Sequence, residues 1–310
     1  MKSRLRLACA LLIGLILAVP VTAWCENLRV VVLLSDDYAP YQSFANTFTK
    51  NLPPQIIASV LNHPEQLGPD MPQGDLIVAV GTSAVAAAIE RNEAPVLSVM
   101  LPKSGFENLL GKAITNVSKD NVSAIYLDQP WTRQIDFWRA ALPDRPRIGL
   151  LHTSNSWIDF SKLQHEIAQR NGMLVARPVH TSDDLFTTLE NIMSISDVLI
   201  AIPDNNIYSS SNIRNILLSS YRRGIPLVGI SQAYVNAGAL CAIFSTPEQL
   251  ANQAREAVVS YARSRKLPEP RFPDSYTISV NRQVARSMNL DVPSEEAIRD
   301  HMEKAERVRR

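Results

Sequence analysis

The sequence predicts an α/β protein of two doubly wound lobes, each built on a parallel β-sheet, joined by a multi-strand hinge. Two observations support this prediction. Near-continuous apolar runs alternate with helical stretches, as expected for parallel strands covered by helices on both faces. This alternation occurs twice, in a repeat too long for a solenoid. The chain has 310 residues, 46% of them hydrophobic, which is enough for two cores.

The elements of each set follow from these runs. In the first set we expect strands at 28–34, 76–80 and 96–101 and helices at 41–52 and 83–91. In the second we expect strands at 147–151, 173–178, 198–202 and 227–230 and helices at 158–171, 183–193 and 211–223. An amphipathic helix is expected at 131–141, and the late segments should be a strand at 239–244, a helix at 246–265 and a strand at 276–280.

Prolines and the late segments indicate where the chain passes between the lobes. We expect crossings near 142–147, 240–245 and 268–273. The first lobe should therefore comprise residues 27–143 plus about 246–273. The second should comprise 146–240 plus about 275–310.

The internal repeat is visible residue by residue. LRVVVLL, with Arg29, corresponds to PRIGLLH, with Arg147. DLIVAV from Asp75 corresponds to DVLIAI from Asp197, and the proline before the next strand occurs at positions 95 and 226. The separation between the copies grows slowly along the chain, as loop insertions in two copies of one fold would cause.

The first residues resemble a secretory signal. A basic start is followed by an apolar stretch too short to span a bilayer and by the small-residue pattern Val21-Thr22-Ala23, so we expect residues 1–23 to be a signal peptide and the protein to be periplasmic. Cys9 lies within that signal. Cys25 could be lipidated, free or paired with Cys241.

Several function classes are disfavoured. The chain has 31 basic and 30 acidic side chains, and three of the basic ones lie among the first six residues. The rest of the chain is nearly neutral and has no basic block of the kind that binds nucleic acid. The five histidines show no metal-ligand spacing, and G-x-S-x-G, Walker and H-E-x-x-H motifs are absent from the sequence. We therefore expect a protein that is not an enzyme and that uses no cofactor or metal.

Five segments, in fixed order, resemble the ABC-transporter substrate-binding proteins of the TrpX-like family. They are VGTSAVAAAIERNEAPVLSVML, ALPDRPRIGLLHTSNSW, DVLIAIPDNN, RGIPLVGISQAYVNAGALCAIF and YTISVNRQVARSMNLDVP. The resemblance implies the type I periplasmic-binding-protein fold with flavodoxin-like lobes. It also implies a monomeric receptor that closes over an amino acid or similar solute and delivers it to an ABC permease. The alternatives are a sensor that reports to a membrane receptor or kinase and, less favoured, a periplasmic α/β enzyme.

The expected site lies where the strands of both lobes end, because ligands of parallel α/β sheets bind beyond the carboxyl ends of the strands. Gly81, Thr82 and Ser83 follow one strand, where a hydroxyl can cap the next helix and free N–H groups can face an anion. Asp204 and Asn205 follow the equivalent strand of the second lobe. The resemblance implies that the first group holds a ligand carboxylate and the second its amino end.

Further candidates follow other strand ends. Aromatic rings there favour a planar or apolar ligand body, and the expected ligand-binding set is completed by Tyr41, Phe106, Trp157, Tyr208, Gln232 and Tyr234. Compared with the family, the chain loses an acid near Ser231 and gains Lys103. The hypothesis that follows is a cleft less suited to a simple zwitterion and more tolerant of an anionic or neutral ligand.

Overall fold

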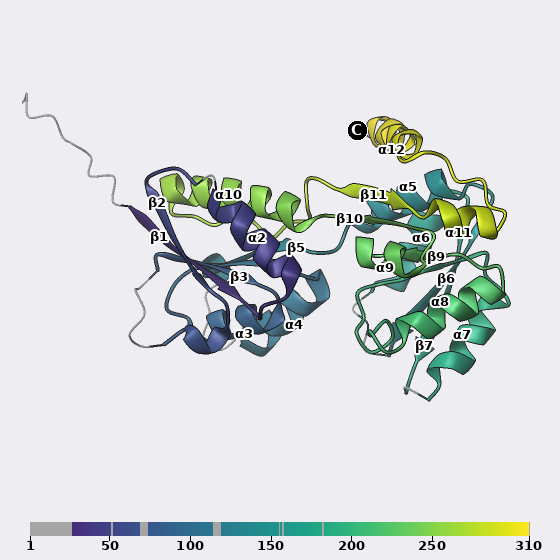
Figure 1. The fold of residues 1–310 in the computed structure, drawn as a ribbon, viewed down its shortest axis with the longest axis horizontal. Helices are drawn as coiled ribbons and strands as arrows, with labels where there is room; N and C mark the ends of the chain where they lie inside the picture. Colours follow the sequence, from purple (N-terminus) through teal and green to yellow (C-terminus); the bar gives the residue numbers. More distant parts are fainter. Residues whose placement is uncertain are drawn as a thin grey trace, which may run out of the picture.

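The computed structural model describes residues 27–50, 52–68, 74–113, 119–154, 156, 158–181 and 183–309. In this part of the chain the protein forms two α/β lobes side by side, with the C-terminal helix on the outside of the second lobe (Figure 1). The expected signal peptide, Cys25 and Trp157 lie outside the described residues. No helix in the described ranges is both long and apolar enough to cross a membrane.

The first lobe is built on a fully parallel sheet in the order β2-β1-β3-β4-β5. Its strands are β1 (Leu28–Leu34), β2 (Ile56–Leu61), β3 (Leu76–Val80), β4 (Val96–Leu101) and β5 (Val122–Tyr126). Its helices are α2 (Ala39–Lys50), α3 (Thr82–Arg91), α4 (Lys103–Ala113) and α10 (Pro247–Ser264), with short 3-10 turns at Pro64–Gln66 and Lys119–Asn121.

Alternate residues of β1 separate the two cores of this lobe. Val30 and Val32 face a core shared with α2 and α10, whereas Val31 and Leu33 face a core shared with α3 and α4. Because both faces of the strand are buried, its sequence is a continuous apolar run. The expected doubly wound arrangement is confirmed.

The second lobe has a sheet in the order β11-β10-β9-β8-β6-β7, parallel except for β11, which pairs antiparallel with β10. Its strands are β6 (Arg147–Thr153), β7 (Met173–Val179), β8 (Val198–Ile200), β9 (Leu227–Gly229), β10 (Cys241–Phe244) and β11 (Thr277–Val280). Its helices are α5 (Trp131–Ala141), α6 (Phe160–Ala168), α7 (Leu185–Met193), α8 (Ile213–Arg222), α9 (Gln232–Ala237), α11 (Arg282–Ser287) and α12 (Glu295–Arg309).

The repeated Arg and Asp of the sequence form the same interlock in both lobes. Asp75, which precedes β3, accepts hydrogen bonds from the backbone N–H of Arg29 (2.8 Å) and from its guanidinium (3.2 Å to Nη2). Asp197, which precedes β8, accepts the same bonds from the N–H of Arg147 (2.9 Å) and from its guanidinium (3.1 Å to Nε). Both copies of the repeat therefore contain the same Arg–Asp interaction, which fixes the register between neighbouring strands.

This interlock predicts a pH dependence of stability. The hydrogen bonds from Arg147 lower the pKa of the Asp197 carboxyl below its usual value. A lowered pKa contributes stability that is complete above the pKa of the unfolded chain, near 4, and is lost as the pH falls through the folded value. Wild type should therefore be more stable than Asp197→Asn in urea titrations between about pH 5 and 7, and the difference should shrink below about pH 4.

Asp75→Asn provides the matched comparison. Burial acts to raise the pKa of Asp75, but the hydrogen bonds and charge of Arg29 outweigh it and the pKa is lowered. The same loss of difference is expected in the first lobe. A stability difference that stays constant from pH 7 to about pH 2 would contradict this explanation.

The chain passes between the lobes at 127–130, 245–246 and 265–276, where β5 leads to α5, β10 to α10, and α10 to β11. The crossing expected at 142–147 is wrong, because α5 belongs to the second lobe. Its residues Ile135, Phe137 and Trp138 are buried in the same core as β6 and β8. An amphipathic pattern identifies a buried face but not the core that receives it. We propose that the second lobe begins at α5 and includes β10.

Hydrogen bonds connect all three crossings. Gln129 is buried and donates through Nε2 to Ser245 Oγ (2.8 Å), which donates to the carbonyl of Ser275 (2.6 Å). Arg133 donates to Gln129 Oε1 (2.6 Å) and to the carbonyl of Pro273 (2.8 Å). The three crossings are therefore linked to one another by hydrogen bonds.

Candidate functional site

A cavity of about 720 Å³ lies between the lobes at the carboxyl ends of their strands. The first lobe contributes the start of α4, and the connection from β5 to α5 and Phe272 in the third crossing form the wall nearest the hinge. The second lobe contributes the ends of β6 and β8 and one face of α6. This size suits a small organic molecule.

The start of α4 is held by a carboxylate of the β5–α5 connection. Asp128 Oδ1 accepts a hydrogen bond from the backbone N–H of Lys103 (2.7 Å). Burial raises the pKa of the Asp128 carboxyl, against the lowering effect of that hydrogen bond and of the Lys103 charge. Lys103 Nζ lies 3.6 Å from Glu107 Oε1 and 5.9 Å from the centre of the Phe272 ring. The Lys103 ammonium group and the Glu107 carboxylate thus lie side by side on this wall.

Asp204 joins two strand ends of the second lobe. Its Oδ2 accepts from Thr153 Oγ1 (2.9 Å) at the end of β6, and its Oδ1 accepts from the backbone N–H of Asn206 (3.0 Å). Asp204 remains partly exposed, and Asn205 beside it is exposed; both line the cavity. Oδ2 also accepts from the backbone N–H of Thr153 (3.3 Å), so Oδ1, which has one neutral donor, is the oxygen that can accept a further hydrogen bond from a ligand.

One face of α6 completes the second-lobe wall. Asp159 caps this helix by accepting from the N–H of Lys162 (3.0 Å), and residues 159, 162, 163 and 166 follow one another at helical spacing along the cavity. The Oε2 atom of Glu166 is buried and has no hydrogen-bond partner among the described residues. This oxygen is therefore left without a donor next to the cavity.

Two aromatic rings, Phe272 and Trp131, line the wall nearest the hinge. Phe272 packs edge-on against Tyr126, with ring centres 5.2 Å apart, and Tyr126 in turn packs against Phe106 at 5.9 Å. Burial, with smaller contributions from Glu107 and Asp128, raises the pKa of Tyr126 to about 12. The Phe272 ring is thereby held rigidly by a buried aromatic cluster.

Of the expected site residues, Asp204 and Asn205 line this cavity, whereas Gly81, Thr82, Ser83 and Tyr41 lie at another part of the first lobe, where β1 and β3 end. Thr82 and Ser83 are exposed, and Gly81 has a φ of 85°. A Cβ on Gly81 would lie 2.6 Å from the Tyr41 hydroxyl. This backbone therefore requires glycine.

The expectation that Thr82 or Ser83 caps α3 is wrong. The helix is preceded by Gly81 without a side-chain cap. Ser35, at the end of β1, supplies the hydroxyl instead: its Oγ accepts from the N–H of Ala84 (3.0 Å) and donates to the carbonyl of Val80 (2.9 Å). The cap comes from a neighbouring strand, which local sequence does not reveal.

The other expected residues lie away from the cavity lining. Phe106 lies on α4 with its side chain buried, and Tyr208 is buried with its hydroxyl donating to the carbonyl of Ile200 (3.3 Å). Tyr234 donates to the carbonyl of Tyr208 (3.1 Å), and exposed Gln232 donates to Asn236 (2.9 Å). Phe106 and Tyr208 therefore stabilise the cores of their lobes, because burying an aromatic ring among other side chains favours the folded state.

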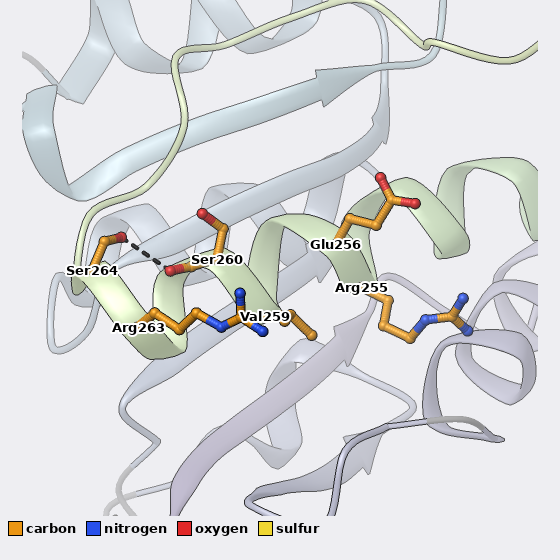
Figure 2. A pocket seen from close by; sticks show the side chains of 6 residues that line it. All are labelled: Arg255, Glu256, Val259, Ser260, Arg263 and Ser264. Atoms are coloured by element: carbon orange, nitrogen blue, oxygen red, sulfur yellow. Dashed lines mark hydrogen bonds between the residues drawn. The ribbon is translucent and has the colours of Figure 1, made fainter.

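A second hollow, of about 330 Å³, follows the outer side of α10 (Figure 2). All of its lining side chains come from this one helix: Arg255, Glu256, Val259, Ser260, Arg263 and Ser264. It touches neither the strand ends nor the second lobe. Within the described ranges, no group of three or more metal-ligating side chains is found there or elsewhere. The inter-lobe cavity is therefore the candidate site.

Two α/β lobes around one ligand-sized cavity define a solute-binding architecture. The comparison with protein families is specific: residues 58–300 match the family described as ABC transporter substrate binding protein, and the chain belongs to this family. A curated relative, the tyrosine-binding protein of Clostridioides difficile (strain R20291), is 24% identical over 235 residues. That match covers 73% of this chain and 66% of the relative, slightly under two thirds of its length.

Solved structures show the same fold. A ligand-free, open substrate-binding protein with adhesive properties from Clostridium difficile matches with a TM-score of 0.66 and 17% identity, covering 87% of this chain and 97% of that one. An ABC domain in complex with L-Trp from Streptococcus pneumonia matches with a TM-score of 0.63 and 17% identity, covering 89% and 98%. The expected type I periplasmic-binding-protein fold is confirmed.

Proposed function

We propose that this protein is the periplasmic solute-binding component of an ABC importer and that it binds one small amino-acid-like or planar solute between its lobes. The observation that carries the proposal is the cavity lined by both lobes at their strand ends. A tyrosine-binding relative and an L-Trp-bound structural neighbour support this ligand size. The partner would be an inner-membrane permease, and the protein would act as a monomer delivered by its N-terminal signal.

The proposed mechanism is a shift between open and closed arrangements. Asp128, which holds the start of α4, and Asp204 of the second lobe both line the cavity, and in this mechanism they would contact the solute together only when both lobes approach it. Ligand binding therefore favours closure in proportion to the difference in affinity between the two states. The linked crossings around Gln129 and Ser245 would form the hinge.

A thermal-shift screen of amino acids, nucleobases and aromatic acids tests the proposal. A ligand present at 100 times its Kd stabilises the protein by about 2.7 kcal/mol, so a true ligand raises Tm by several degrees. If no member of such a screen raises Tm or binds by calorimetry, the proposed function fails.

Asp204→Ala should lower the affinity for the solute found in this screen by about tenfold or more, because a charge-assisted hydrogen bond is lost. Calorimetry would measure the affinity, and circular dichroism would check that the variant is folded. Asp183→Ala, at an exposed position of the same lobe outside the cavity, is the control. Unchanged affinity in Asp204→Ala would remove this residue from the site.

A further inference from the structure

The cavity between the lobes carries a marked excess of negative charge. Five carboxylates line it, and only two cationic side chains do. The carboxylates are Glu107, Asp128, Asp159, Glu166 and Asp204, and the cations are Lys103 and Lys162. The hypothesis drawn from the sequence, that the loss of an acid near Ser231 and the gain of Lys103 favour an anionic or neutral ligand, considered two turns and not the carboxylates at positions 128, 159 and 166.

The ion pairs of the lining do not remove the excess. Among the described residues, Lys103 and Glu107 form the ion pair of this cavity, at 3.6 Å. Asp128, Asp159 and Asp204 instead accept hydrogen bonds from neutral donors, namely backbone N–H groups and the Thr153 hydroxyl. Such bonds satisfy the oxygen atoms and leave the negative charge in place.

Two further features indicate how the charge could be compensated. Glu166 has a buried carboxylate oxygen without a partner among the described residues, which is costly unless a cation lies nearby. The Phe272 ring, which lines the cavity, already has an ammonium group 5.9 Å from its centre, that of Lys103. Together with Trp131, it offers the cavity an aromatic face that attracts cations.

We propose that the solute bound between the lobes is a net cation, an organic amine or guanidine with an apolar or planar body, rather than a neutral zwitterion or an anion. This proposal rests on the proposed function and specifies its ligand. The cationic group lies among Asp128, Glu166 and Asp204, and the body of the ligand packs on Phe272 and Trp131. Burial raises the pKa of Asp128 in spite of the nearby Lys103 charge, so the Asp128 carboxylate is poorly solvated next to the cavity and a cationic ligand group would stabilise its charged form.

A series of probes that differ in charge but share a ring tests the proposal. Tryptamine, L-tryptophan and indole-3-acetate form one set, and tyramine, L-tyrosine and 4-hydroxyphenylacetate form the other. In thermal-shift and calorimetric titrations at about 50 mM salt, the amine of at least one set should bind tenfold or more tightly than its zwitterion and its acid. Raising the salt to about 0.5 M should weaken the binding, because screening acts on the charge term.

Two isosteric variants connect that preference to the cavity. Glu166→Gln and Asp128→Asn keep the shape of the side chain and one acceptor oxygen but remove one charge each, so the affinity for the amine should fall about tenfold, whereas the affinity for the zwitterion should change less. Glu256→Gln, on the exposed side of α10, is the control and should bind like wild type.

The outcomes separate this proposal from the proposed function. An amine that binds no more tightly than its zwitterion or acid overturns the charge proposal, and so does an amine preference that survives in both variants. Binding of the zwitterions alone leaves the inter-lobe solute site standing with a different ligand. Absence of binding by all six probes overturns the charge proposal and counts against the proposed function as well.

Discussion

Replacing Asp136 with alanine is expected to lower the stability of the second lobe by about 3–5 kcal/mol, because it leaves two arginines without their shared counter-ion. Asp136 lies on α5 and is only 7% exposed. Its carboxylate accepts from Arg170 Nε (2.9 Å) and from Arg309 Nη1 (2.9 Å). One buried charge thus holds the loop after α6 and the end of the C-terminal helix α12 against α5.

Urea denaturation followed by tryptophan fluorescence measures this loss. Arg309→Gln is the graded comparison: this side chain is 38% exposed, so its removal should cost about 1 kcal/mol and mainly release the last turn of α12. A loss below about 1 kcal/mol for Asp136→Ala would show that the three charges contribute little beyond packing.

Phe137→Ala is expected to cost about 3–5 kcal/mol, and the loss should be confined to the second lobe. Phe137 is fully buried, in the core that α5 shares with β6 and β8. Native-state hydrogen exchange should show reduced protection in the strands of the second sheet, while amides of β1 and β3 keep theirs.

Phe44→Ala is the matched variant for the first lobe, because Phe44 is fully buried in the core that α2 shares with β1 and α10. In Phe44→Ala, amides of the first sheet should lose protection from hydrogen exchange, while those of the second sheet keep theirs. If Phe137→Ala instead weakens the first sheet, α5 belongs to the first lobe and the boundary proposed here is incorrect.

How much of the fold could be predicted depends on how many sides of an element are buried. β3 and β4 are buried at every residue, so their apolar runs were visible in the sequence. β2 lies at the sheet edge, and only Ile56 of its six residues is buried, so it had no continuous run and was not predicted. α4 was not predicted, because Gly105 and the proline that precedes the helix obscure its helical pattern.

For the same reason, part of the lining of the candidate site could be predicted. The rule that ligands bind beyond strand ends identified Asp204 and Asn205, which follow a strand that the sequence reveals. Asp128 follows β5, which was not recognised, so the same rule could not be applied to it. Glu166 lies on one face of α6, and whether it lines the cavity depends on how α6 is positioned relative to the cavity. Tertiary packing sets that position, so the local sequence does not predict it.

The central claim, one solute held between two lobes that close over it, is tested most directly by small-angle X-ray scattering. The protein would be measured alone and saturated with the solute that raises its Tm most. Closure predicts a smaller radius of gyration and a narrower distance distribution, with the molecular mass unchanged. Identical scattering curves with and without a solute whose binding calorimetry has established would contradict the claim.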